Sequence, residues 1–322
     1  MKQFFRKRYL GVPLWWFLPV MGVALLGLLV GTFFDKQIST MVVKQKGWLG
    51  MFFESYGMIP TGMLGAMAFG AIAKGLSQFE GKKFKVFAIA VSIAGIALFG
   101  YLMADHISDP YSLTPNLNKV AAFFVGAAIC AGVEALCYFV LYKNAPKNVL
   151  IIVGAIALLS LGVSFGVNEI LKHVAYRPRF RYLAGLTYNA DGVYGHSPLD
   201  ISYYRAWYED WQWFSYQKYR DLDPLIVKDC VKSFPSGHTC YACLFLSLPY
   251  LVYPCVSEEK RAKVMTAGYI AGVIYIGLVA VARVEVGAHY VSDVSFAILE
   301  GSCAALAMFL LGEKFTKRFL TE

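Results

Sequence analysis

The sequence has few charged residues. Asp, Glu, Lys and Arg together make up 16% of its 322 residues, whereas 58% are hydrophobic. Soluble domains carry roughly 25% charged residues, so this composition excludes an ordinary soluble protein. Apolar runs long enough to cross a bilayer recur along the whole chain, and no stretch between them is polar enough to form a soluble domain. We expect a single integral membrane domain that spans residues 1–322.

The chain also lacks the cysteine pattern of a disulfide framework. Of its seven cysteines, all except Cys230 lie in or beside apolar segments, where cysteine behaves as a small buried hydrophobe. Cys240 and Cys243 lie close together beside an apolar run, which supports neither a disulfide nor a metal site. No convincing cleavage site follows the first apolar run, so we expect that run to remain as a helix.

Apolar runs of roughly 18 or more residues predict an all-α, polytopic bundle of about eight transmembrane helices. The expected spans are 14–34, 57–73, 86–104, 120–142, 149–171, 239–256, 264–282 and 290–312. If the N-terminus is cytoplasmic, 16 of the 30 Lys and Arg residues fall in five short cytoplasmic segments. This bias predicts cytoplasmic N- and C-termini, most naturally in the plasma membrane. It also accounts for the net charge of +9 without a nucleic-acid partner.

One long polar stretch, 172–238, is expected on the non-cytoplasmic side. Its segment 180–234 is dense in aromatic residues, whose amphipathic rings favour the headgroup region of a bilayer. We interpret this segment first as an interfacial loop and second as a lid over a lipid headgroup. The spacing of Trp207, Trp211 and Phe214 fits a short surface helix under either interpretation.

Polar residues cluster at the expected outer ends of four consecutive helices. Because consecutive helices alternate in direction, these ends come to one level and can share a site. The clusters are 172–181, 235–238, Arg283, and His289 with Asp293.

His289 and Asp293 are four residues apart, which places them on one face of a helix within contact distance. A carboxylate that accepts the proton of one ring nitrogen fixes the tautomer and exposes the lone pair of the other, as nucleophilic catalysis requires. A capping or core polar pair is the alternative. A carboxylate one turn inside a span costs ~2.5–3.5 kcal/mol on insertion scales, which indicates that it has a partner or a purpose.

The segment 235–238 has the residues of a tight turn at a helix start. Free backbone N–H groups there attract anions, the Ser236 hydroxyl adds a donor, and His238 faces the same point. A simple helix-start turn is the alternative. The cations Lys172, Arg177, Arg179 and Arg181, together with Arg283, would form a pocket for a phosphoryl group. For each cation singly, snorkelling to the interface is the alternative.

At these residues the sequence resembles the type 2 phosphatidic acid phosphatase superfamily. The family motif Lys-x6-Arg-Pro matches from Lys172 to Arg179, with Phe180 in place of proline. Pro-Ser-Gly-His is complete at 235–238. Ser-Arg-x5-His-x3-Asp matches from Arg283 to Asp293, with Ala282 in place of serine. The resemblance covers about residues 149–312, and the departures delete neither a nucleophile nor a proton donor.

The resemblance implies a phosphatase with a six-helix core, to which the pair within 86–142 is additional. It implies that His289 attacks phosphorus and forms a phosphohistidine, that Asp293 supports His289, and that His238 protonates the leaving oxygen. The phosphate-binding residues would be Lys172, Arg179, Ser236, Gly237 and Arg283. The substrate would be a lipid phosphate or polyprenyl diphosphate among membrane lipids, and no metal or other cofactor would be needed.

Other functions remain open from the sequence. Glu134, Glu169 and Glu300 lie in or at the end of spans, as in transporters with ion or proton pathways. A zinc hydrolase could use His238, His289 and Asp293 as ligands. A phosphotransferase would pass the phosphoryl group to an acceptor other than water.

Overall fold

A computed structural model describes residues 8–9, 12–44, 47–108, 113–114, 117–185, 187–188, 194–195, 199–209 and 228–320. The long helices are α2 (Phe17–Val42), α4 (Ile59–Ser77), α5 (Lys82–Ile107), α6 (Lys119–Leu136), α7 (Lys147–Ala175), α12 (Glu258–Glu285) and α13 (Val291–Leu320). The short helical segments are η1 (Leu14–Trp16), α3 (Trp48–Tyr56), η2 (Cys137–Leu141), α8 (Phe180–Leu183), η3 (Ile201–Tyr203), η4 (Lys228–Val231), α10 (Gly237–Cys243), η5 (Leu244–Ser247), α11 (Leu248–Val252) and η6 (Tyr253–Cys255). Two antiparallel pairs of two-residue strands complete the elements, β1 (Arg8–Tyr9) with β2 (Val12–Pro13) and β3 (Thr187–Tyr188) with β4 (Tyr194–Gly195).

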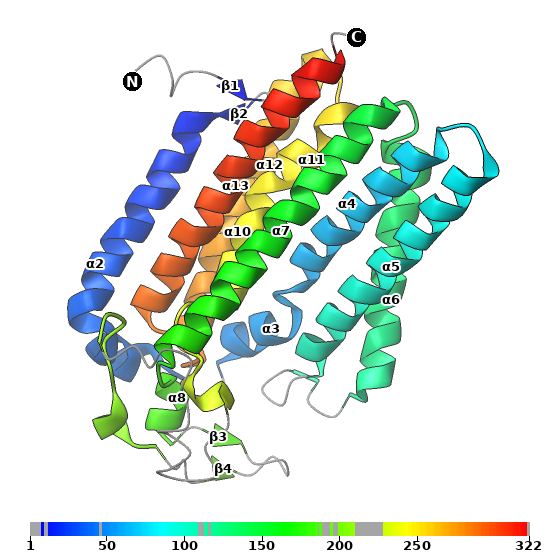
Figure 1. Ribbon diagram of the computed structural model, residues 1–322. Coiled ribbons are helices and arrows are strands. Elements are labelled where there is room, and N and C mark those ends of the chain that lie inside the picture. Colours follow the sequence, from blue (N-terminus) through cyan, green and yellow to red (C-terminus); the bar gives the residue numbers. More distant parts are fainter. Residues whose placement is uncertain are drawn as a thin grey trace.

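The expected all-α, polytopic architecture is confirmed. Within the described ranges, seven helical stretches are long and apolar enough to cross a membrane, and they lie side by side in one bundle (Figure 1). Their many exposed Leu, Val, Ile and Phe side chains suit a lipid solvent. The chain is an integral membrane protein.

The expected span 239–256 differs from the other seven. It is a succession of short segments, α10, η5, α11 and η6, instead of one regular helix. Pro249 and Pro254 lie within it, and proline removes a backbone donor and clashes with the preceding turn. Most residues of α10, η5 and α11 are buried, so the interrupted backbone from α10 to α11 is largely shielded from lipid.

The two ends of the bundle have different character. Strand β1 and the end of α13 lie at one end, whereas α3, α8 and the β3–β4 pair lie at the opposite end (Figure 1). The polar clusters fall at this second end, which we call the site end. Which end faces the cytoplasm stays a prediction from the charge bias.

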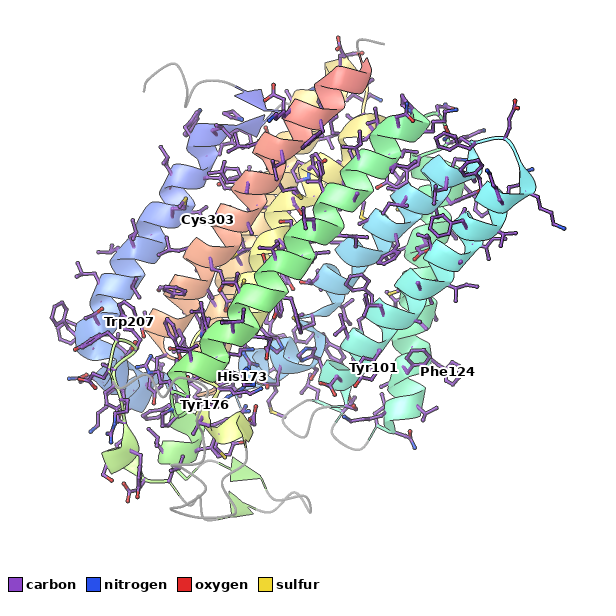
Figure 2. All side chains as sticks on the ribbon, in the orientation of Figure 1. Tyr101, Phe124, His173, Tyr176, Trp207 and Cys303 are labelled. Carbon is purple, nitrogen blue, oxygen red and sulfur yellow. The ribbon has the colours of Figure 1, made fainter. Side chains whose placement is uncertain are left out.

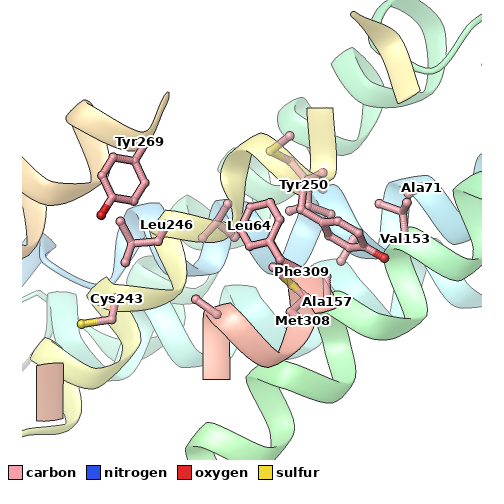
Figure 3. Packing of buried hydrophobic residues seen from close by; sticks show 14 of the residues in the cluster. Leu64, Ala71, Val153, Ala157, Cys243, Leu246, Tyr250, Tyr269, Met308 and Phe309 are labelled. Atoms are coloured by element: carbon pink, nitrogen blue, oxygen red, sulfur yellow. The ribbon is translucent and has the colours of Figure 1, made fainter. Parts of the chain in front are cut away.

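Close backbone packing sets the position of α10 and α7. A Cβ atom on Gly301 of α13 would lie 2.5 Å from the carbonyl oxygen of Cys240, and one on Gly154 of α7 would lie 2.5 Å from that of Ala68. Small residues of this kind let membrane helices approach closely. Between them lies an apolar core that includes Leu64, Tyr250, Met308 and Phe309 (Figure 3).

Helices α5 and α6 lie at the edge of the bundle, against α4 and away from α2 (Figure 1). They correspond to the pair that the sequence marks as additional. A Cβ atom on Gly126 would lie 2.7 Å from the carbonyl oxygen of Gly100, so the two helices pack backbone to backbone. The site end of α5 reaches α3, and this contact brings the pair to the polar clusters.

Candidate active site

Backbone hydrogen bonds join the polar clusters at the site end, although they are far apart in sequence. They are Ser233 N–H to Arg177 O (2.9 Å), Arg179 N–H to Cys230 O (2.9 Å), Arg181 N–H to Gly287 O (2.8 Å) and Ser236 N–H to Asp293 O (3.3 Å). Main-chain bonds of this kind fix relative position independently of side-chain rotamers. The three sequence motifs therefore share one region.

The end of α7 directs the first cluster toward this region. Lys172 lies in the last turn, and Tyr176 ends the helix in the left-handed conformation with φ of 44°. That conformation is unusual for a residue with a side chain, and it turns the chain sharply. Figure 2 shows His173 and Tyr176 at the site end of α7.

His289 lies on the short connection between α12 and α13, after Gly287 with φ of 68°. Its side chain is 2% exposed, and its Nδ1 atom lies 2.5 Å from the carbonyl oxygen of Ser233. An Nδ1–H that donates to this carbonyl leaves the lone pair on Nε2. Burial first, and then the charges of Arg283 and Arg179, hold the pKa of His289 well below its usual range. The imidazole is thus neutral at neutral pH.

Asp293 lies farther from His289 than the sequence pattern predicts. Its Oδ2 atom is 3.8 Å from His289 Nδ1, beyond hydrogen-bond distance. It accepts instead from Arg177 Nη1 (2.6 Å), Ser233 Oγ (2.5 Å) and Tyr290 N–H (2.9 Å). The carbonyl of Ser233 is the nearer partner of His289, and a main-chain contact of this kind leaves no signal in the sequence.

Arg177 separates from the other cations of its cluster. Besides Asp293 it binds Asp35 of α2 (3.0 Å) and the hydroxyl of Ser292 (2.8 Å), and its guanidinium lies 3.9 Å from the ring centre of Tyr290. It therefore links α2 to the start of α13. Asp35 is fully buried and was not among the expected site residues.

Each predicted phosphate-binding cation has a carboxylate partner. Lys172 pairs with Glu169 (2.9 Å), Arg179 with Asp229 (2.8 Å) and Arg283 with Glu54. Arg181 joins the last two pairs, because it lies 3.1 Å from Asp229 and 3.6 Å from Glu54.

The carboxylates balance this buried positive charge. Burial alone would raise the pKa of Asp229, but Arg179 and Arg181 outweigh it and hold that pKa well below its usual range. Sequence reasoning missed Glu54 and Asp229. Only their positions in the sequence point to the site. Glu54 lies just before the expected span 57–73, and Asp229 lies in the segment before Pro235.

Ser236 and Gly237 begin α10 beside Lys172. The Ser236 hydroxyl accepts weakly from the N–H of Thr239 (3.5 Å), which is an N-cap contact. A Cβ atom on Gly237 would lie 2.8 Å from Lys172 Nζ, so glycine leaves the room that the ammonium occupies. The predicted anion-binding turn and the first cationic cluster are thus adjacent.

His238 is buried in the same region, and its Nε2 atom has no hydrogen-bond partner among the described residues. Burial first, and then the charges of Arg283, His106 and His289, hold the pKa of His238 well below its usual range. The charges of Arg283 and Lys172 act on both His238 and His289, so both imidazoles belong to one cationic site. Its ring lies 4.6 Å from that of His106, at 76°. His106 comes from the end of α5 and was not expected here.

The aromatic loop is described only in part. The indole of Trp207 stacks on Phe234 (5.8 Å), and its Nε1–H donates to Thr32 Oγ1 of α2 (3.0 Å; Trp207 is labelled in Figure 2). Trp211 and Phe214 lie outside the described residues, so the surface helix stays a prediction. The described part of this loop packs against the site end of the bundle.

The three acidic residues that favoured a transporter lie in different surroundings. Glu169 contributes to the site through Lys172, and Glu300 accepts from Asn168 Nδ2 (3.2 Å), one turn before Lys172 on α7. Glu134 lies apart, between α5 and α6, where it accepts from Ser92. Within the described ranges, no three His, Cys, Asp or Glu side chains gather as a metal ion would need.

A family model described as the PAP2 superfamily matches residues 153–317, just over half of the chain. The match contains all three sequence motifs and excludes α5 and α6. No curated protein and no solved structure matches the chain significantly.

Proposed function

Because the chain belongs to the PAP2 superfamily, whose members are phosphatases, we propose that it removes phosphate from a membrane lipid through a phosphohistidine on His289. The observation that carries this proposal is the setting of His289. Its Nδ1 atom faces a carbonyl, and the charges of Arg283, Arg179 and Lys172 act on the ring. This arrangement favours a neutral nucleophile beside a bound phosphoryl group.

The reaction proceeds in two steps. In the first, the negative charge of the bound phosphate offsets the surrounding cations, so that His238 takes up a proton. The lone pair of His289 Nε2 then attacks phosphorus, the bond to the leaving oxygen breaks, and His238 donates its proton to that oxygen. In the second, water attacks the phosphohistidine, neutral His238 takes a proton from the water, and phosphate leaves as the phosphorus–nitrogen bond breaks. Asp293 acts through Ser233 and Arg177 to hold the loop that carries His289.

Lys172, Arg179 and Arg283 bind the phosphate oxygens, with the Ser236 hydroxyl and the Gly237 N–H as further donors. Guanidinium groups suit this role because they form charge-assisted bonds to several oxygens at once. The carboxylates of Glu169, Asp229 and Glu54 keep these cations oriented. The mechanism requires no metal and no other cofactor.

A lipid phosphate or polyprenyl diphosphate is the substrate class that fits this position. The cations lie at the site end of a bundle of apolar helices, where a headgroup meets the bilayer boundary. With the positive-inside bias, this end is the non-cytoplasmic face of the plasma membrane. The whole chain, residues 1–322, acts as a single membrane domain.

Phosphate release from a panel of lipid phosphates, diphosphates and soluble sugar phosphates tests the proposal. The purified wild type should prefer lipid substrates, His289→Ala should abolish release, and a matched variant of a histidine outside the proposed machinery, His173→Ala, should retain it. Preference for soluble sugar phosphates, or full activity in His289→Ala, would refute the proposal.

Three further arms separate the rival functions. Activity that collapses in chelator and returns with zinc would support a metal-dependent hydrolase instead. Added alcohol that captures most of the phosphoryl group would support a phosphotransferase. Substrate flux into vesicles that survives His289→Ala would support a transporter.

A further inference from the structure

Helix α5 places His106 against the proposed general acid. The rings of His106 and His238 lie 4.6 Å apart and meet edge to face at 76°. Aromatic rings favour this arrangement, because the positive edge of one ring meets the negative face of the other. His106 comes from the helix pair outside the matched family region.

His238 has few other restraints on its ring. It is 8% exposed, and its Nε2 atom has no hydrogen-bond partner among the described residues. Its charged and titratable neighbours include Arg283 of α12, Lys172 of α7 and His289. The two cations repel a protonated imidazole and donate no orienting bond to it. Within the part of the chain that the structure describes, the edge-to-face contact with His106 is therefore a restraint on the plane of this ring.

The site end of α5 is itself tied to the active site. The N–H of Leu113 donates to the Ser55 hydroxyl (2.6 Å), and the Thr114 hydroxyl donates to the carbonyl of Ile107 (2.7 Å). Ser55 follows Glu54, whose carboxylate pairs with Arg283. The turn that carries His106 is thus fixed relative to a proposed phosphate-binding residue.

We propose that His106 is a positioning residue that holds the imidazole of His238 in the plane from which it protonates the leaving oxygen. This inference rests on the proposed function, because it assigns a role relative to the general acid of that reaction. Small errors in the position of such a group are costly, since general acid catalysis contributes about 10²- to 10⁴-fold to a rate. Loss of the ring should forfeit part of that factor.

A comparison of leaving groups tests the inference. An alkyl alcohol is a poor leaving group that depends on the acid, whereas a nitrophenolate leaves without a proton. We would measure kcat/KM, which reports the steps up to formation of the phosphohistidine and not its hydrolysis, with dodecyl phosphate and with a nitrophenyl phosphate that carries the same alkyl chain. His238→Ala should lose far more activity with dodecyl phosphate than with the nitrophenyl ester.

His106→Ala should show the same selectivity in milder form, a loss of roughly tenfold with dodecyl phosphate and under about twofold with the nitrophenyl ester. His106→Phe keeps a ring and should restore most of the lost rate. His106→Asn replaces the alanine variant if that variant fails to fold. His173→Phe, at the same end of the bundle, is the matched control and should leave the ratio of the two rates unchanged.

The outcomes separate the two levels of the proposal. If His238→Ala affects both esters equally, the general acid role of His238 fails. A second outcome is that His238→Ala slows dodecyl phosphate far more than the nitrophenyl ester while the His106 variants slow both esters equally or slow neither ester. In that case the positioning role of His106 is wrong and the proposed function stands.

Discussion

Asp293 lies one helical turn after His289 and is held by three groups, the guanidinium of Arg177, the hydroxyl of Ser233 and the N–H of Tyr290. The same Ser233 accepts, through its carbonyl, from His289. The carboxylate therefore shapes the loop, and the carbonyl fixes the ring. These two tasks are separable by substitution.

Asp293→Asn should lower kcat by less than His289→Ala does, because the Ser233 carbonyl still fixes the tautomer. It should also lower the free energy of unfolding by about 3 kcal/mol, since Arg177 loses one of its two buried carboxylates. Kinetics and thermal unfolding in detergent would measure both effects.

The control is Asp105→Asn, which breaks an exposed pair with Lys119 (3.0 Å) and should cost no more than about 1 kcal/mol. An Asp293→Asn variant as inactive as His289→Ala, with unchanged stability, would show instead that the carboxylate acts directly on the ring.

Gly237→Ala should weaken substrate binding. Its Cβ atom would lie 2.8 Å from Lys172 Nζ and displace the ammonium from the proposed phosphate site. Loss of one charge-assisted contact, worth about 1.5–3 kcal/mol, predicts at least a roughly tenfold rise in KM. Gly166→Ala on α7 meets no atom within 4 Å and serves as control. An unchanged KM in Gly237→Ala would remove Lys172 from the binding site.

The sequence identifies side chains better than it identifies their partners. His238, His289 and the cations are readable because their types and spacings serve one chemistry. Glu54, Asp229 and His106 were missed because each meets its partner across a tertiary contact, such as that between α3 and α12. For Glu54 and His106 the signal is that a polar residue near the end of an apolar span needs a partner, and for Asp229 it is the position in the segment before Pro235.

At the scale of elements, helices are well predicted and their irregularities are not. Seven long apolar runs became seven long helices, because hydrophobic length alone dictates that outcome. The run at 239–256 has a similar composition but contains Pro249 and Pro254, and it breaks into short segments. Its burial among other helices makes the break tolerable, and burial is not visible in a hydropathy profile.

The pair α5–α6 depends on close contact at Gly126, where a Cβ atom would lie 2.7 Å from the carbonyl oxygen of Gly100. Gly126→Val should push the helices apart, destabilise the protein and, through His106, reduce the rate with dodecyl phosphate more than with the nitrophenyl ester. Gly132→Val on the same helix meets no atom within 4 Å and is the control. If Gly126→Val and Gly132→Val show the same stability and the same ratio of the two ester rates, the α5–α6 pair does not affect the site.

At the scale of the whole molecule, burying two neutral imidazoles links folding to pH. The pKa values of His238 and His289 lie well below the ordinary value, so the unfolded chain binds protons near pH 6.5 that the folded chain does not. Stability from this source is present above about pH 6.5 and declines as the pH falls below that value.

The temperature of the unfolding midpoint in detergent should therefore decrease as the pH is lowered from about 7.5 to about 5.5, the range in which histidine titrates. A variant with both His238→Asn and His289→Asn should show a smaller fall. An equal fall in both proteins would assign the pH dependence to other groups.

The central claim is that two buried imidazoles address one phosphorus atom, and an experimental structure with orthovanadate tests it most directly. We predict vanadium bonded to His289 Nε2, with a His238 nitrogen roughly 2.6–3.2 Å from the opposite apical oxygen and Lys172, Arg179 and Arg283 on the remaining oxygens. Vanadate bound away from His289, or His238 out of reach of the apical oxygen, would contradict the account.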